Sequence, residues 1–145
     1  MTLFRARIVL GVSTIVGLGM AVGCSSSDEG GTQPVTCTGT TCSCAAGASC
    51  TFSQSGCSGG SCSLECKDKS QCSGTCGESC SITCSGGSSC NTTVGKSGSV
   101  SCTEGATCNV TCTADCSVTC GTDSTCTLKC SGDTEVRSIP QGGNC

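Results

Sequence analysis

Cys116-Ser-Val-Thr-Cys120 is the stretch that decides the fold of this chain, because related stretches recur along the sequence. Two cysteines flank one aliphatic residue, and a polar residue separates each cysteine from it. Such strict alternation is typical of a β-strand, with both cysteines and the aliphatic residue on one face. The related stretches are Cys62-Ser-Leu-Glu-Cys66, Cys80-Ser-Ile-Thr-Cys84, Cys108-Asn-Val-Thr-Cys112 and Cys126-Thr-Leu-Lys-Cys130.

The cysteines repeat with a period of 18 residues, as in the series Cys66, Cys84, Cys102 and Cys120. Each unit holds two five-residue strands, joined by one loop of five residues and one of three. A fixed period of this kind indicates a solenoid, in which each repeat packs on its neighbours. The predicted strands are 62–66, 80–84, 98–102 and 116–120 in a first set, and 72–76, 90–94, 108–112 and 126–130 in a second.

The pattern continues less regularly toward both ends. Thr40 to Cys44 and Cys50 to Gln54 fit an earlier coil, and Thr134 to Ser138 fits a last strand of the first set, with Val136 inward at its centre. The sequence therefore predicts an all-β domain over residues 37–145. Its expected architecture is a thin, two-sided parallel β-solenoid (β-helix) of about five 18-residue coils with a disulfide-filled core.

The composition supports a core of sulfur. The chain has 145 residues with 21 cysteines, 2 phenylalanines and no tryptophan, tyrosine or histidine. Cysteine at this level is the signature of a disulfide scaffold, and such scaffolds belong to oxidising compartments. The absence of histidine removes the most common general base, and no catalytic constellation is recognisable, so we expect no enzyme activity.

The disulfide pairing is inferred from one repeat in which two cysteines are missing together. Val94 and Gly98 stand where the repeat would place two cysteines, on either side of one three-residue loop, which indicates that the equivalent cysteines pair with each other. Pairing between coils remains the alternative. With the same reasoning for the other loops, the predicted bridges are Cys44–Cys50, Cys57–Cys62, Cys66–Cys72, Cys76–Cys80, Cys84–Cys90, Cys102–Cys108, Cys112–Cys116 and Cys120–Cys126. The remaining cysteines give Cys37–Cys42 and Cys130–Cys145, since Thr134 stands where the local partner of Cys130 would be.

The N-terminus has the features of an export signal. Residues 1–23 combine the basic Arg5 and Arg7 with an apolar stretch that is short for a membrane span. The stretch ends in Ala21-Val22-Gly23-Cys24, which resembles a bacterial lipobox, although the usual leucine is replaced by alanine. The resemblance implies a lipidated Cys24 and a membrane-lipid partner, and setting Cys24 aside leaves an even number of cysteines. An ordinary cleaved signal peptide is the alternative.

Residues 24–36 are rich in serine and glycine, as expected of a flexible tether. By resemblance to Gram-negative lipoproteins, Ser25 implies sorting to the outer membrane. Together with the repeat, the chain resembles the Cys-rich repeat lipoproteins of Gram-negative bacteria. We therefore expect an exported, lipid-anchored protein with a structural or interaction role at the cell surface or in the periplasm.

The outward-facing positions of the second strand set form polar columns that could bind a ligand. Thr111-Cys112-Thr113 resembles the repeat of the insect β-helical antifreeze proteins, and this resemblance implies ice as one ligand, beside a polysaccharide. The bland alternative is that serine and threonine are simply good polar strand residues. The predicted face is Thr75, Asn91, Thr93, Asn109, Thr111 and Thr127.

Other ligand classes are disfavoured. The formal net charge is −3 and aromatic residues are nearly absent, which argues against nucleic-acid binding. Thiolate metal sequestration is a further alternative, but export would oxidise the thiols, so no metal site and no cofactor are predicted. The sequence identifies no particular protein or glycan partner.

Overall fold

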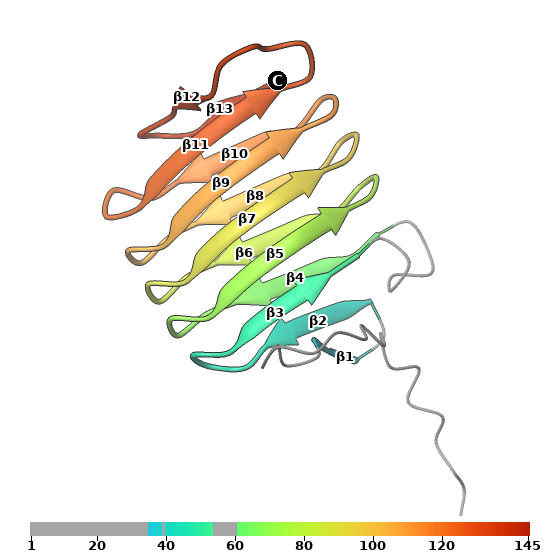
Figure 1. Cartoon of the computed structure of the whole chain (residues 1–145), viewed down its shortest axis with the longest axis vertical. Helices are drawn as coiled ribbons and strands as arrows, with labels where there is room; N and C mark the ends of the chain where they lie inside the picture. The colour runs from blue at the N-terminus through green and yellow to red at the C-terminus, as the bar shows by residue number, and fades with distance from the viewer. Residues whose placement is uncertain (1–34, 39, 54–60) are drawn as a thin grey trace, which may run out of the picture.

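The computed structural model describes residues 35–38, 40–53 and 61–145, with the backbone alone for 36–38. Every regular element in these ranges is a β-strand, and the strands stack into a two-sided parallel solenoid (Figure 1). None of the described residues belongs to a helix that is long and apolar enough to cross a membrane. The predicted fold class is therefore confirmed. The signal segment 1–23 and almost all of the tether lie outside the described residues.

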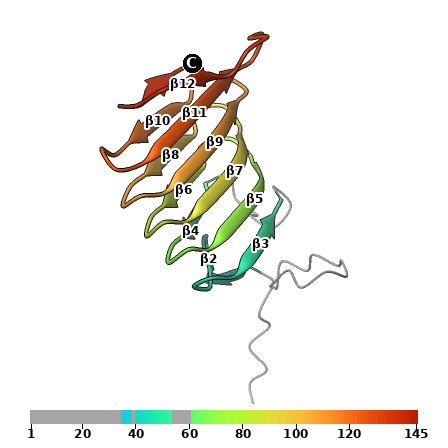
Figure 2. The same cartoon turned by 60° about the vertical axis from the view of Figure 1, so that its left-hand side comes forward.

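Two sheets form the walls of the solenoid, and the chain alternates between them through five coils (Figures 1 and 2). Sheet A contains, in spatial order, β1 (Thr36–Thr38), β2 (Thr41–Cys44), β4 (Ser63–Cys66), β6 (Ser81–Cys84), β8 (Ser99–Cys102), β10 (Ser117–Cys120) and β13 (Gly143–Asn144). Sheet B contains β12 (Arg137–Ser138), β11 (Thr125–Cys130), β9 (Thr107–Cys112), β7 (Ser89–Val94), β5 (Gln71–Cys76) and β3 (Ser49–Phe52).

The register of the coils follows the sequence period. In the regular part, each strand residue lies opposite the residue 18 positions later, as in Val100↔Val118 and Val110↔Leu128. The first coil is longer, since Thr41 lies opposite Ser63. In a parallel ladder without slippage, identical repeat positions form straight columns along the solenoid. The sequence period is thus converted into columns of like side chains.

The core is made of the inward residues that the alternation predicts. The central column of sheet A contains Leu64, Ile82, Val100 and Val118, all at most 3% exposed. The facing column of sheet B is less uniform and contains Phe52, Gly74, Thr92, Val110 and Leu128. Half-cystines flank both columns, so sulfur fills the space that leucine and phenylalanine occupy in other small domains.

Eight disulfides link pairs of described cysteines, and each joins the two sheets within one coil or closes the C-terminal end. Their Cα–Cα distances range from 5.5 to 6.5 Å. All eight agree with the predicted bridges, seven of them from the repeat and Cys130–Cys145 from the cysteines left over. They are Cys44–Cys50, Cys66–Cys72, Cys76–Cys80, Cys84–Cys90, Cys102–Cys108, Cys112–Cys116, Cys120–Cys126 and Cys130–Cys145.

Two further predicted bridges, Cys37–Cys42 and Cys57–Cys62, involve residues that are not fully described. Cys42 and Cys62 are both disulfide-bonded. Cys57 and the side chain of Cys37 lie outside the described part of the chain, although the backbone pairs Cys37 with Cys42 across β1 and β2. These two pairings therefore remain predictions.

The bridges hold the sheet margins unusually close. Sheets that pack through ordinary side chains lie ~10 Å apart, whereas bridged Cα atoms here are at most 6.5 Å apart. Most bridges close loops with a sequence separation of four or six residues. On the chain-entropy model a loop of this size contributes about 2 kcal/mol by restricting the unfolded chain. The domain therefore depends on covalent restraint where a larger protein would depend on apolar burial.

The loop at Val94 and Gly98 shows how one coil does without a bridge. Val94 is fully buried, and a Cβ atom added at Gly98 would collide with Cγ1 of Val94. One valine side chain thus occupies the space that two half-cystines fill in the neighbouring coils. In the next coil, Cys116 Sγ lies 3.6 Å from the carbonyl oxygen of Val94. The neighbouring bridge therefore packs directly on the coil that has valine in place of cysteine.

The five-residue loops are tight turns, and those at 45–49, 67–71, 85–89 and 103–107 contain left-handed backbone. In the loop at 67–71, Asp68 and Lys69 have φ values of 54° and 64°, and the Ser70 amide donates to the carbonyl of Lys67. The next loop places Gly86 and Gly87 at the same positions, where glycine adopts positive φ without strain. The Lys69 amide donates to the Gly86 carbonyl at 2.9 Å, which ties one loop to the next.

The prediction of a last parallel strand over Thr134–Ser138 is wrong. Only Arg137–Ser138 forms a strand, β12, which pairs antiparallel with β11 in sheet B, and Val136 is 57% exposed. The chain reverses immediately after β11, because Gly132 adopts a φ of 89° and the Asp133 amide bonds to the Cys130 carbonyl. It therefore returns along sheet B and does not cross to sheet A.

The residues after β11 form a cap over the last coil. β13 pairs antiparallel with β10 and so covers sheet A, while β12 covers sheet B. Ile139, between these strands, is buried, and its amide donates to the Cys126 carbonyl of β11 at 3.0 Å. Antiparallel strands at the end of a parallel stack protect its edges, and β1 does the same for sheet A at the other end.

Candidate binding face and rim pocket

The six residues of the predicted binding face all lie on the outer surface of sheet B. They form two adjacent columns in register, and Asn109 lies opposite both Asn91 and Thr127 on neighbouring strands. Thr127 Oγ1 donates to Asn109 Oδ1 at 2.8 Å, which connects two coils. The other column continues the series Thr75, Thr93 and Thr111. The structure therefore brings the predicted residues together as one surface.

A third column on the same face was missed by the sequence prediction. The strands of sheet B begin one residue before the first cysteine, so β5 starts at Gln71 and β9 at Thr107. The alternation of polar and buried residues, extended by one position, would have found it. The additional outward residues are Gln71, Ser89, Thr107 and Thr125, all exposed.

The face of sheet B is polar, nearly neutral and regular. In the four regular strands its three columns contain only serine, threonine, asparagine and glutamine, apart from Lys129 in the last of them. Parallel strands lie ~4.8 Å apart, so the hydroxyl and amide groups repeat at that spacing. Such a surface offers hydrogen bonds in a flat array and fits an extended, uncharged ligand rather than an ionic one.

The outer face of sheet A is less uniform. Its first column repeats serine at positions 63, 81, 99 and 117. The second column contains Glu65, whose Oε2 lies 3.1 Å from Lys67 Nζ, with both side chains about half exposed. An exposed pair of this kind contributes little to stability. Sheet A therefore provides a matched surface against which the face of sheet B can be tested.

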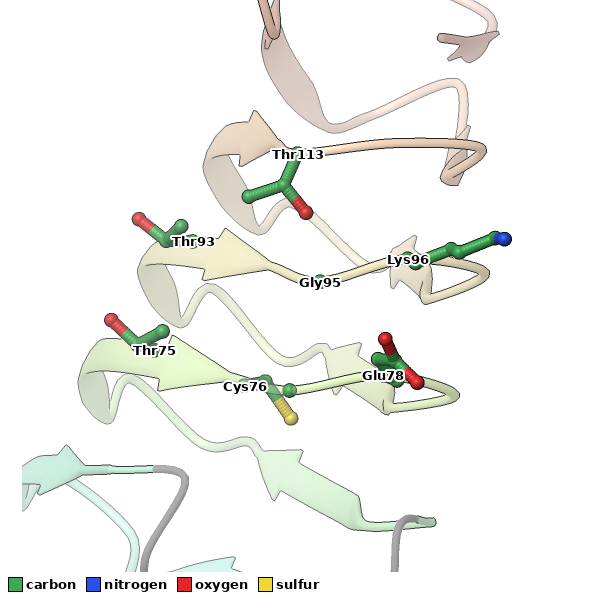
Figure 3. A pocket seen from close by; sticks show the side chains of 8 residues that line it. Thr75, Cys76, Glu78, Thr93, Gly95, Lys96 and Thr113 are labelled. Atoms are coloured by element: carbon green, nitrogen blue, oxygen red, sulfur yellow. The ribbon is translucent and has the colours of Figure 1, made fainter.

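A pocket of about 300 Å³ opens beside the face of sheet B, where β5 and β7 run into their three-residue loops. In Figure 3, Thr75 and Thr93 at the strand ends form one side, and Glu78 and Lys96 on the stacked loops form the other. Gly77 and Gly95 also line the pocket, and Figure 3 shows Thr113 above Gly95. The pocket shares Thr75 and Thr93 with the face, so both belong to one continuous surface.

The pocket exists because two glycines are stacked. A Cβ atom at Gly95 would lie 2.6 Å from the carbonyl carbon of Gly77, so a side chain does not fit between these loops. The Gly95 amide donates to the Cys76 carbonyl at 2.8 Å, which fixes the close approach. The lining residues carry three hydroxyls, one carboxylate and one ammonium group, although in Figure 3 the Lys96 ammonium points away from Thr75 and Thr93. Sequence alone did not predict this pocket, although the repeat of glycine at 77 and 95 was a usable signal.

Two groups of sulfur atoms in the core lie as close together as the ligands of a metal ion, but they resemble a metal site in no other respect. The sulfur atoms of Cys66, Cys84 and Cys90 lie within 4.8 Å of one another, as do those of a second group, which is Cys102, Cys108 and Cys126. All six cysteines are disulfide-bonded, so their sulfurs carry no thiolate charge in this state. Metal binding by thiolates would require the protein to be reduced first.

Comparison with known proteins gives no family for this chain: no family model, curated protein or solved structure matches it. The predicted lipidation site, Cys24, lies outside the described residues. The candidate site is therefore defined by the geometry of sheet B and the adjacent pocket.

Proposed function

We propose that this chain is an exported lipoprotein that displays a rigid β-solenoid from a lipid anchor on Cys24. Its role is structural or interactive, at the surface or in the periplasm of a Gram-negative bacterium. The sulfur core is the observation that carries the proposal. With 14 half-cystines buried in seven bridges, the fold needs an oxidising compartment, and the cytosol keeps thiols reduced.

The N-terminal sequence supports the same assignment independently. An apolar stretch ending in Ala21-Val22-Gly23-Cys24 is consistent with export followed by lipid attachment. A diacylglyceryl group and an N-acyl chain supply more than one acyl anchor, which is enough for stable membrane binding. Residues 25–34 then provide a spacer between the bilayer and the folded domain, in whose core Val35 is buried.

Metabolic labelling tests the anchor directly. The full chain is produced in a Gram-negative host with radiolabelled palmitate, beside a Cys24→Ala variant. We expect label in the membrane-bound wild type and none in the variant. A Ser25→Asp variant should remain labelled but shift from the outer to the inner membrane. An unlabelled wild type would overturn the lipoprotein assignment.

A second candidate function is polysaccharide binding by the face of sheet B. The continuous surface formed by the three polar columns and the pocket favours this candidate. A repeating, neutral hydrogen-bonding array matches the repeating hydroxyl groups of a glycan, and the pocket has room for a small polar ring. The carboxylate of Glu78, on the loop beside the pocket, would then orient one sugar unit at the end of the array.

Glycan-array binding with two matched variants tests this candidate. Thr93→Arg places a large charged side chain on the face of sheet B, and Ser99→Arg places the same group on sheet A. We expect the first variant to lose glycan binding and the second to retain it. Equal loss in both variants would contradict the assignment to sheet B. Thermal hysteresis without glycan binding would instead assign the face to ice.

A further inference from the structure

The bridge Cys130–Cys145 differs from the other described bridges in its exposure. In the remaining seven, every cysteine is at most 7% exposed. Cys145 is exposed and Cys130 is half-buried, so this bridge can be reached from solvent. It also closes a longer loop than the others, with a sequence separation of 15. A disulfide that is accessible to thiols is the type that undergoes exchange.

A cation contacts one of its two sulfurs. Arg137 Nη2 lies 2.8 Å from Cys130 Sγ, and the side chain of Arg137 is about half exposed. Asp133 holds this arrangement in place, since its Oδ2 accepts from the Cys130 amide at 3.2 Å and lies 3.6 Å from Arg137 Nε. A guanidinium group beside a cysteine stabilises the thiolate. The two sulfurs are therefore unequal: Cys130 is the better leaving group and Cys145 the more accessible target.

We propose that Cys130–Cys145 is a thiol–disulfide exchange site that captures an external thiol on Cys145. The attacking thiolate forms a new S–S bond with Cys145 Sγ, and the Cys145–Cys130 bond breaks. The electron pair of the broken bond remains on Cys130 as a thiolate beside Arg137. One disulfide is consumed and one is formed, so the step needs no other oxidant or reductant.

The substrate class is an accessible thiol, small or on a protein. Its product is a covalent adduct at the end of the solenoid. The released segment 131–145 carries β12 and β13, so exchange also loosens the cap that covers the last coil. Seven buried bridges maintain the body of the solenoid while this one opens. The inference is independent of the lipid anchor and of glycan binding.

Reduced glutathione serves as the probe in the test. The purified full-length protein is incubated with it, quenched with acid and mapped by mass spectrometry. We expect a single glutathione adduct on Cys145, with free thiol on Cys130 and the seven buried bridges intact. An adduct mainly on Cys130, an even distribution over many bridges, or no adduct under conditions that modify an exposed model disulfide would each overturn the proposal.

Variants separate the role of Arg137 from general charge attraction. Arg137→Gln removes the stabilisation of the leaving thiolate, so exchange should slow by about tenfold. Asp133→Asn removes the carboxylate that holds Arg137 beside Cys130 Sγ, so it should also slow exchange. Lys129→Gln is the matched control, because it removes a nearby surface charge without touching the bridge. The measurement is repeated with β-mercaptoethanol, a neutral thiol. The role given to Arg137 would be overturned if Arg137→Gln and Lys129→Gln slowed exchange with glutathione equally and neither variant slowed exchange with the neutral thiol.

Discussion

The turn from Val94 to Gly98 and the turn from Cys112 to Cys116 are consecutive copies of one loop, but only the second carries a disulfide. Their backbones are nevertheless alike. Ser97 and Asp115 have φ values of 57° and 50°, and Gly95 and Thr113 donate equivalent hydrogen bonds to the coil below, at 2.8 and 3.0 Å. The comparison indicates that alternation and register determine the path of the chain. The bridge adds stability chiefly by restricting the unfolded state.

Removal of the bridge from the second turn should have the largest effect. Cys112→Ala with Cys116→Ala loses both the cross-link and the buried sulfur, and we expect the free energy of unfolding to fall by about 4 kcal/mol. Cys112→Val with Cys116→Gly copies the first turn and should cost only about 2 kcal/mol, because Val refills the space. Guanidinium unfolding without reductant measures both. An equal loss in the two variants would contradict the space-filling account of Val94.

Introduction of the missing bridge should have an intermediate effect of opposite sign. Val94→Cys with Gly98→Cys should form a disulfide like its neighbours and raise the free energy of unfolding by about 2 kcal/mol. Mass spectrometry verifies the new bond, and the gain should vanish when the bond alone is reduced. Val94→Ser with Gly98→Ser is the control without sulfur. Failure of the two introduced cysteines to pair would show that the two turns are not equivalent.

A smaller effect is expected within the same coil at Thr92. This residue is 2% exposed, and its Oγ1 has no hydrogen-bond partner among the described residues. Thr92→Val keeps the shape and matches Val110 in the next coil, so it should raise the free energy of unfolding by about 1 kcal/mol. Thr93→Val, on the outer face, is the control and should change stability little. A destabilised Thr92→Val protein would mean that the hydroxyl is satisfied in solution.

Much of the fold could be predicted because the repeat is visible in the order of polar, aliphatic and cysteine residues along the chain. Alternation around Val118 identifies a strand, and the joint loss of cysteine at Val94 and Gly98 identifies which cysteines face each other across a loop. Seven bridges among the described residues have this pairing. Once the period is known, columns on the outer face follow from counting. The predicted binding residues therefore lie together, as expected of a parallel ladder.

The prediction failed where the repeat ends. Val136 between two polar residues resembles a strand centre, but the turn at Gly132 and Asp133 reverses the chain first. The choice between crossing to sheet A and returning along sheet B depends on that turn and on the burial of Ile139, which no periodicity encodes. The pocket was missed for a similar reason. It depends on how closely Gly77 and Gly95 stack, a distance between coils rather than a pattern within one.

The central claim is that the bridges run within coils, between the two sheets. A disulfide map of the purified, non-reduced protein tests it most directly, with thiols blocked at acid pH and fragments sequenced by electron-transfer mass spectrometry. We expect bonds between cysteines four to six positions apart, such as Cys112–Cys116 and Cys102–Cys108, and the single long bond Cys130–Cys145. Bonds between cysteines 18 positions apart, such as Cys84 with Cys102, would contradict it.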